Sequence, residues 1–286
     1  MKNRILQYMM VMAAFVVASC SDDEPRPQGE FIPIVSGDIT LAAELDVPVG
    51  AGPHPALIMI HGSGEQDRHI YAGAANNYLR VGIAVLRYDK RGVGQSTGQY
   101  LDVNTENSTE VFPILADDIV AIANFLANHP EIDAERIGLL GPSQAGWIMP
   151  LAAVNTSLIS YMVSISGATS SVGISDFYDV IAELSLSDQE IADALADYDG
   201  VQGYDPRADL ELLDIPALWI YGGKDKSNPT ANDVMIIDLV KTEFDKDYTV
   251  HLFPNLNHDL VDVNTNQTIL DTQLCLNDWL NEKLGL

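Results

Sequence analysis

Short apolar runs alternate along this chain with longer segments of helical periodicity, and this alternation constrains the fold more than any other feature. The runs rich in β-branched and aliphatic side chains cover residues 56–60, 82–87, 136–140, 161–165, 217–221 and 248–253. The segments with apolar residues at helical spacing cover residues 113–128, 144–154, 231–241 and 267–283. Strands that alternate with helices in this way predict right-handed βαβ units. The sequence therefore predicts an α/β fold over residues 36–286, with a mostly parallel central sheet and helices on both faces.

Two segments depart from this alternation. Residues 39–45 alternate only weakly, which suits an antiparallel strand at the edge of the sheet. About fifty residues separate the strand ending near Ser166 from the strand at Ala217, more than a crossover connection needs. A helix is expected over residues 175–184 and a second one after Ser187, where Ser187 and Glu190 match a capping box. Residues 169–215 are therefore predicted to form a small helical cap.

The first 19 residues have the layout of a secretory signal peptide. Lys2 and Arg4 precede an apolar run over residues 5–17, which is too short to span a bilayer. Ala18 and Ser19 then precede Cys20, and this pattern resembles the lipobox of bacterial lipoproteins. The resemblance implies that Cys20 is lipidated and begins the mature chain, with residues 20–35 as a flexible, acidic tether. An ordinary signal peptide that happens to contain a cysteine is the alternative.

The strong negative charge restricts the partners. The formal net charge is −26, and phosphate binding needs a basic face, so nucleic acid is not expected as a partner. Membrane attachment would depend on the lipid on Cys20 rather than on a basic patch. Acidic residues just after that cysteine resemble export signals of surface lipoproteins in some Gram-negative bacteria. The expected location is the bacterial cell envelope, with the chain anchored in the outer membrane and exposed at the surface.

Two serines compete for the role of a nucleophile. Residues 94–98 match the pattern G-x-S-x-G around Ser96, whereas residues 141–145 deviate around Ser143 because Ala145 replaces the last glycine. A nucleophile elbow, however, is a tight turn between a strand and a helix. Ser143 has an apolar run before it and a helical segment after it, whereas a polar loop follows Ser96. Ser143 is therefore the predicted nucleophile, with Ala145 as an irregular position in the elbow.

Three motifs that follow successive strands resemble the α/β-hydrolase superfamily. They are His61-Gly62-Ser63-Gly64, Asp89-Lys90-Arg91-Gly92 and residues 141–146. They are most similar to those of serine esterases in the acyl-esterase and prolyl-oligopeptidase-like group, and the resemblance covers residues 36–286. It implies a catalytic triad in the chain order serine, acid, histidine.

The acid and the base are expected in loops after the last two strands. Asp225 follows a glycine turn after the strand at 217–221, and His258 lies in the loop after the strand at 248–253. His251 falls inside that last strand and is expected to be structural. A base activates the serine hydroxyl, and a carboxylate holds the base in the correct tautomer. Ser143, His258 and Asp225 are thus the predicted triad.

Donors for the developing oxyanion are expected on two segments. The backbone N–H of Gln144, directly after the nucleophile, is one candidate. The second is expected from the loop after the strand at 56–60, from Ser63 or Gly64, and the sequence does not choose between them. No residues match the spacing of a metal site, a P-loop or a dinucleotide fingerprint, so neither a metal nor a cofactor is expected.

These features predict a serine hydrolase, and specifically a carboxylesterase. The expected substrates are small esters or acyl groups such as acetyl or feruloyl on polysaccharides, because a surface lipoprotein meets such polymers. Two alternatives stay open: a peptidase of the prolyl-oligopeptidase type, which the short chain disfavours, and a catalytically silent binding lipoprotein with the same fold.

Overall fold

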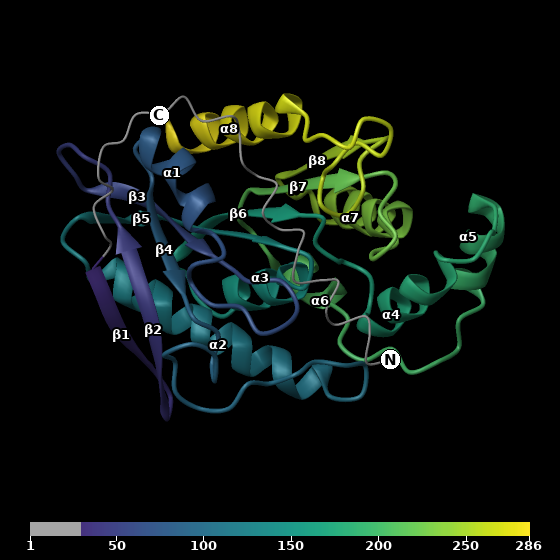
Figure 1. The fold of residues 1–286 in the computed structure, drawn as a ribbon, viewed down its shortest axis with the longest axis horizontal. Coiled ribbons are helices and arrows are strands. Elements are labelled where there is room, and N and C mark those ends of the chain that lie inside the picture. The colour runs from purple at the N-terminus through teal and green to yellow at the C-terminus, as the bar shows by residue number, and fades with distance from the viewer. Residues whose placement is uncertain (1–29) are drawn as a thin grey trace.

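The computed structural model describes residues 30–286 (Figure 1). The predicted signal peptide, the lipidation site Cys20 and most of the predicted tether lie outside the described residues. Within residues 30–286, no helix combines the length and the apolar character that a membrane span requires.

One eight-stranded sheet forms the centre of the domain, in the order β1-β2-β4-β3-β5-β6-β7-β8 (Figure 1). The strands are β1 (Glu30–Ser36), β2 (Ile39–Asp46), β3 (His54–Met59), β4 (Ala84–Tyr88), β5 (Ile132–Pro142), β6 (Ile159–Ile165), β7 (Ala217–Gly222) and β8 (Tyr248–Phe253). β3 to β8 run parallel to one another, whereas β1 and β2 are antiparallel. Every residue of β3, β4 and β7 is buried, as a sheet covered on both faces requires. The predicted α/β fold is confirmed.

The antiparallel end of the sheet differs from the prediction. Residues 39–45 do form an antiparallel strand, but β1 covers it and becomes the edge. The predicted tether over residues 20–35 is therefore too long, since it includes most of β1. Pro33 masks the strand pattern in the sequence, yet an edge strand tolerates proline because its outer N–H groups need no partner. Ile32 and Ile34 alternate with it and bury their side chains.

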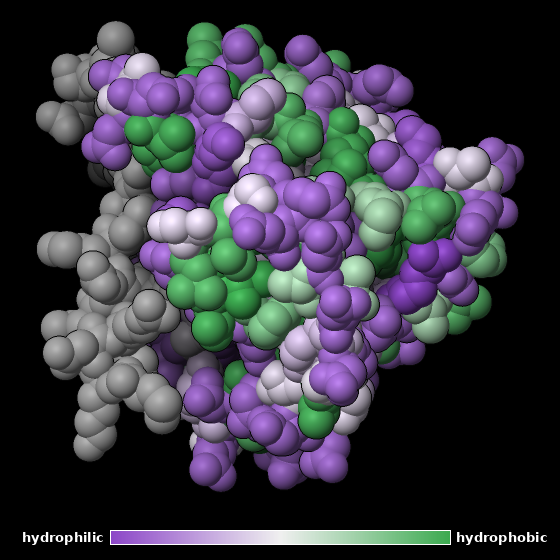
Figure 2. All heavy atoms as spheres, turned by 90° about the vertical axis from the view of Figure 1, so that its right-hand side faces the viewer, coloured by the Kyte–Doolittle hydropathy of each residue, from purple (hydrophilic) through white to green (hydrophobic). Residues whose placement is uncertain are grey.

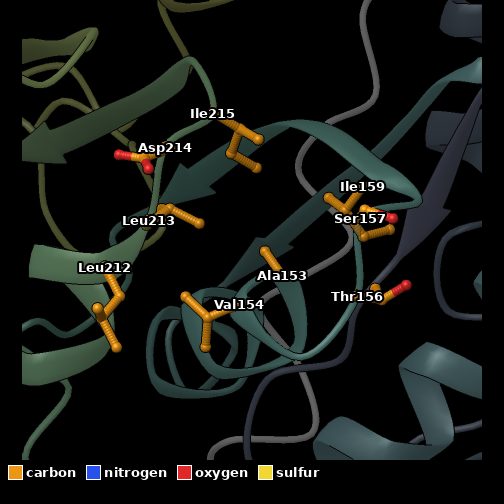
Figure 3. A pocket seen from close by; sticks show the side chains of 9 residues that line it. All are labelled: Ala153, Val154, Thr156, Ser157, Ile159, Leu212, Leu213, Asp214 and Ile215. Atoms are coloured by element: carbon orange, nitrogen blue, oxygen red, sulfur yellow. The ribbon is translucent and has the colours of Figure 1, made fainter.

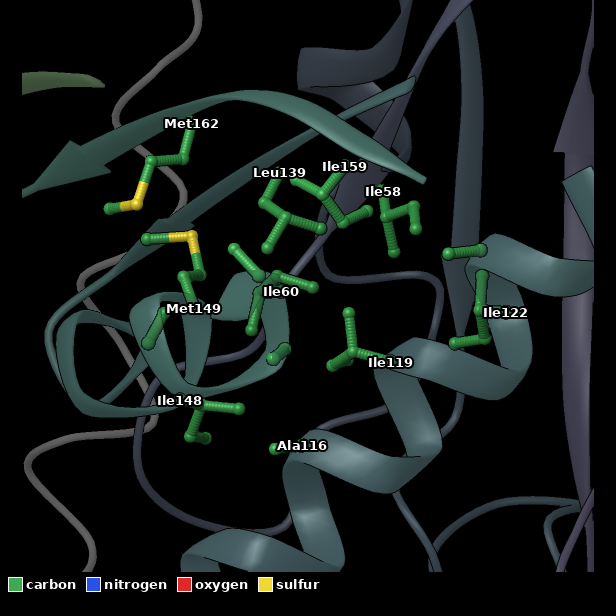
Figure 4. Packing of buried hydrophobic residues seen from close by; sticks show 14 of the residues in the cluster. Ile58, Ile60, Ala116, Ile119, Ile122, Leu139, Ile148, Met149, Ile159 and Met162 are labelled. Atoms are coloured by element: carbon green, nitrogen blue, oxygen red, sulfur yellow. The ribbon is translucent and has the colours of Figure 1, made fainter. Parts of the chain in front are cut away.

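Helices cover both faces of the sheet. They are α1 (Ala72–Arg80), α2 (Ser108–Ala127), α3 (Ala145–Val154), α4 (Val172–Ile181), α5 (Asp188–Ala196), α6 (Arg207–Leu212), α7 (Thr230–Phe244) and α8 (Leu270–Leu284). α1 and α8 pack against one face, where Tyr78 and Trp279 are buried. α2, α3, α6 and α7 supply buried residues to the core on the other face. Figure 4 shows part of that core, in which Ile119 and Ile122 of α2 face strand residues such as Ile58.

The segment between β6 and β7 contains three helices. α4 and α5 extend beyond the ends of β6 and β7, to the right in Figure 1. α5 buries none of its residues, and the predicted capping box of Ser187 and Glu190 starts it. α6 packs on α3 and α7 and so belongs to the helical layer of the main domain. Only α4 and α5 therefore project as a cap.

Candidate active site

The candidate residues follow the carboxyl ends of parallel strands. The loop with Ser63 and Gly64 follows β3, Ser143 follows β5, Asp225 follows β7 and His258 follows β8. Because these strands are parallel, all four positions lie at one edge of the sheet, which is where open α/β sheets bind ligands.

Ser143 occupies a strained turn between β5 and α3. Its φ of 55° lies in the left-handed region, which non-glycine residues adopt rarely. The backbone N–H of Ser143 donates to the Ile165 carbonyl at 3.0 Å, and the N–H of Gly146 donates to the Ser143 carbonyl at 2.9 Å. Hydrogen bonds to β6 and α3 hold this conformation, and the turn has the strand–turn–helix geometry of a nucleophile elbow.

Ala145, the irregular residue of the motif, fits into the elbow because its neighbour is a glycine. Ala145 is completely buried at the start of α3. A Cβ atom on Gly141 would lie 2.6 Å from the Ala145 Cβ and 2.7 Å from the Ile60 carbonyl oxygen, both closer than real contacts allow. The missing side chain of Gly141 thus leaves the room that the Ala145 methyl group occupies.

Ser96, the better literal match to the motif, is a structural residue. Its side chain is buried, and its Oγ donates to the Asp89 carbonyl at 2.7 Å. The same Oγ accepts the N–H of Ala42 at 2.8 Å. These two bonds tie the loop after β4 to β2 and occupy the hydroxyl.

His258 and Asp225 form a hydrogen-bonded pair. His258 Nδ1 lies 2.7 Å from Asp225 Oδ2, and the carboxylate is fully buried while the imidazole is partly exposed. The other carboxylate oxygen accepts the backbone N–H groups of Ser227 and Asn228 at 2.7 and 2.9 Å. This arrangement fixes the Asp225 side chain and leaves His258 Nε2 as the ring nitrogen that can exchange protons with another group.

The electrostatics of the pair favour a histidine that readily accepts a proton. Burial lowers the pKa of His258, but the charge and hydrogen bond of Asp225, together with Asp259 and Asp179, outweigh that effect and raise the pKa above its usual value. His61, by contrast, is buried, and burial and the nearby Lys90 lower its pKa to about 3. His61 is thus neutral and bonded through Nε2 to the Tyr88 carbonyl, which suits a structural role.

The loop after β3 lies against the elbow. A Cβ atom on Gly62 would be 3.6 Å from the Ser143 Cβ, so the peptide groups next to Gly62 face the serine closely. Lys90 belongs to the motif Asp89-Lys90-Arg91-Gly92, from which no role could be predicted for it. It donates from its buried ammonium group to this loop and to the side chain of Gln144. The position of Lys90 within that motif was the available signal, but only the fold shows where its ammonium group lies.

The cap contacts the loop that carries Asp225. The Tyr178 hydroxyl of α4 donates to the Asp225 carbonyl at 2.7 Å. Figure 2 views the molecule from the side that carries α5 and shows apolar patches among mostly hydrophilic residues. The exposed apolar side chains of the cap segment include Val180, Leu184 and Val201. The cap therefore offers apolar surface near the candidate site.

A separate depression of about 490 Å³ lies far from these residues (Figure 3). It is lined by the end of α3, the segment after α6 and Ile159, the first residue of β6. It therefore lies at the amino end of the parallel strands, opposite to the candidate site. Within residues 30–286, no three side chains of the histidine, cysteine or acidic type are grouped to hold a metal ion.

The fold and the strand–turn–helix site define the chain as an α/β hydrolase. Solved structures agree on the fold: 2,6-dihydroxy-pseudo-oxynicotine hydrolase has a TM-score of 0.65 at 21% identity, with coverage of 90% of this chain and 68% of that one. Est1E from Butyrivibrio proteoclasticus, solved with ferulic acid, has a TM-score of 0.63 at 21% identity over 89% of this chain and all of that one. The model of the prolyl oligopeptidase family matches residues 73–286, and the chain belongs to that family.

Curated relatives share parts of the sequence. Esterase EstD from Thermotoga maritima is 26% identical over 255 residues, which cover 78% of this chain and 60% of that protein. An uncharacterized 31.7 kDa protein from Escherichia coli is 30% identical over 124 residues, 43% of this chain and 41% of that protein. The chain thus spans about half the length of these relatives.

Proposed function

We propose that this protein is a carboxylesterase with Ser143 as nucleophile, His258 as general base and Asp225 as the residue that orients His258. The hydrogen bond of 2.7 Å between His258 Nδ1 and Asp225 Oδ2, at the sheet edge that also holds the strained Ser143, is the observation that carries the proposal. A family relationship to hydrolases and the similarity to esterase EstD support it.

The proposed reaction has two steps. Ser143 Oγ attacks the ester carbonyl carbon while its proton passes to His258 Nε2. The tetrahedral intermediate then expels the alcohol, which takes that proton, and an acyl-Ser143 ester remains. In the second step His258 removes a proton from water, the hydroxide attacks the acyl group, and the acid leaves as Ser143 regains its hydrogen. Asp225 stabilises the imidazolium form of His258 in both steps.

The oxyanion of each tetrahedral intermediate needs N–H donors. We assign this role to the backbone N–H of Gln144 and to an N–H in the loop after β3, with Ser63 preferred over Gly64. In the part of the chain that the structure describes, the N–H groups of Gln144 and Ser63 donate to no protein acceptor. Both segments adjoin Ser143, as a pair of donors for one oxygen atom must.

A serine-directed fluorophosphonate probe and p-nitrophenyl esters test the proposal. Wild type should be labelled and should hydrolyse p-nitrophenyl acetate, whereas Ser143→Ala should do neither. Ser96→Ala is the matched control and should still be labelled. Labelling of Ser143→Ala with loss of labelling in Ser96→Ala would refute the assignment of the nucleophile. A wild type that is neither labelled nor active would favour the silent binding protein.

Membership of the prolyl oligopeptidase family makes peptidase activity the second candidate. Hydrolysis of aminoacyl p-nitroanilides at a kcat/KM above that for p-nitrophenyl acetate would favour it. Among esters, we propose acyl groups such as acetyl or feruloyl on polysaccharides, and the solved complex of Est1E with ferulic acid supports testing feruloyl esters first.

We further propose that Cys20 is lipidated and anchors the protein in the outer membrane of a bacterial cell. The pattern of residues 1–20 supports this, and it predicts that palmitate label enters wild type but not Cys20→Ser. Wild type that fractionates with the soluble periplasm, unlabelled, would contradict the anchor.

A further inference from the structure

We infer that the ammonium group of Lys90 is a positioning device for the oxyanion hole, because it binds the two segments that supply the N–H donors. The inference rests on the proposed function of Ser143 and names a residue that the triad does not include.

Lys90 follows β4, and its side chain is buried beneath the loop after β3. Its Nζ donates to the carbonyls of Gly62 and Gly64, the latter at 2.9 Å. Its third contact is with Gln144 Oε1 at 3.4 Å. An ammonium group has three N–H donors, so all three are directed at the two donor segments.

The bond to Gly62 determines the direction of the neighbouring N–H group. In a trans peptide the C=O and the N–H of the same unit point in opposite directions. Because the Gly62 carbonyl faces Lys90, the N–H of Ser63 points away from the ammonium group. This geometry selects Ser63 over Gly64 as the donor that Lys90 orients.

Burying an ammonium group costs desolvation free energy. The surroundings of Lys90 are not those of a structural ion pair. Among residues 30–286, no carboxylate lies within ion-pair distance of Lys90, and its partners are neutral oxygens. Burial lowers the pKa of Lys90 to about 7, while the charge of Asp102 opposes the shift. The neighbouring His61 is neutral, so it adds no second positive charge beside the ammonium group. A positive charge held under the oxyanion loop gains its counter-charge when the tetrahedral intermediate forms.

The first variant is Lys90→Met, which keeps an unbranched side chain of similar volume, one atom shorter, and has no donor. Since displacement of a catalytic group by about 1 Å costs roughly 100-fold in rate, kcat for p-nitrophenyl acetate should fall about 100-fold. KM should change less than about threefold, because the oxyanion forms only after binding. Affinity for a trifluoromethyl ketone, which binds as an oxyanion adduct, should fall by the same factor as kcat/KM.

Arg87→Met is the matched control. Arg87 lies on β4, the strand that Lys90 follows, is as buried as Lys90, and pairs with Glu44 and Asp46. This control should lower the melting temperature but leave kcat and the ketone affinity nearly unchanged. Equal losses of kcat in the two variants would show that Lys90 has only a structural role.

A pH series on wild type needs no variant and covers the case in which Lys90→Met does not fold. Above about pH 7 the neutral amine has two donors for three acceptors, so kcat should decline with the pKa of Lys90. Lys90→Met should lack this decline. A wild-type kcat that stays constant from about pH 7 to 9.5, or a folded Lys90→Met with wild-type kcat, would overturn the inference. An inactive wild type would instead refute the proposed function.

Discussion

Replacing Asp225 by asparagine tests the proposed triad because the substitution changes chemistry with little change in shape. One carboxylate oxygen of Asp225 accepts two backbone N–H groups, and the other contacts His258 Nδ1. An asparagine must keep its single oxygen toward the two N–H donors, because its NH₂ group would leave them unsatisfied. Its NH₂ group therefore faces Nδ1 of His258.

A donor opposite Nδ1, in place of the carboxylate acceptor, forces His258 into the tautomer that carries its hydrogen on Nε2. Nδ1 becomes an acceptor, so Nε2 carries the hydrogen and is unable to receive the Ser143 proton. We expect kcat to fall about 10⁴-fold, equivalent to about 5 kcal/mol in the activation free energy. Since the loop bonds persist, the free energy of unfolding should change by only about 1 kcal/mol.

Hydrolysis of p-nitrophenyl acetate near neutral pH measures kcat, and thermal unfolding measures stability. Asp259→Asn is the matched control: this carboxyl group lies next to His258 in the chain, yet its side chain makes no hydrogen bond to the imidazole. Its kcat should stay within about threefold of wild type. If Asp225→Asn retains more than about a tenth of the wild-type kcat, the assigned role of Asp225 is wrong.

Three further outcomes follow from the site and its support. Ser96→Ala should lose about 1–3 kcal/mol of stability, because two buried backbone groups lose their partner, and chemical denaturation measures this loss. Gly141→Ala should lose about 1–3 kcal/mol or more through overpacking against Ala145 and should lower the melting temperature, and an unchanged melting temperature would contradict the contact argument. Because a raised pKa keeps His258 protonated and inactive at low pH, kcat/KM should rise with pH to a midpoint above the usual histidine value of about 6.5, and a midpoint below it would contradict the expected effect of Asp225.

Much of the fold followed from local pattern. Strands β3 to β7 contain near-continuous buried apolar runs, β8 is an apolar-rich strand at the edge of the sheet, and α2, α3, α7 and α8 have helical periodicity, so their presence and order were predictable. Three elements were missed for physical reasons. β1 contains Pro33, which an edge position tolerates. α1 buries only Ala75 and Tyr78, and the six-residue α6 buries only Leu210, too few for a visible period.

The sequence by itself determined the elbow as a candidate and placed Asp225 and His258 after the right strands, because chain order and strand order are local properties. It could not determine that the Ser96 hydroxyl bonds to the Asp89 carbonyl and the Ala42 N–H. The bond to Ala42 forms only because the sheet brings together segments that are far apart in the chain. Only the tertiary structure brought His258 Nδ1 within 2.7 Å of Asp225 Oδ2, because these residues lie on loops that follow different strands. It also placed the Lys90 ammonium group between the loop after β3 and Gln144, because parallel strands bring their carboxyl ends to one edge whatever their separation in sequence.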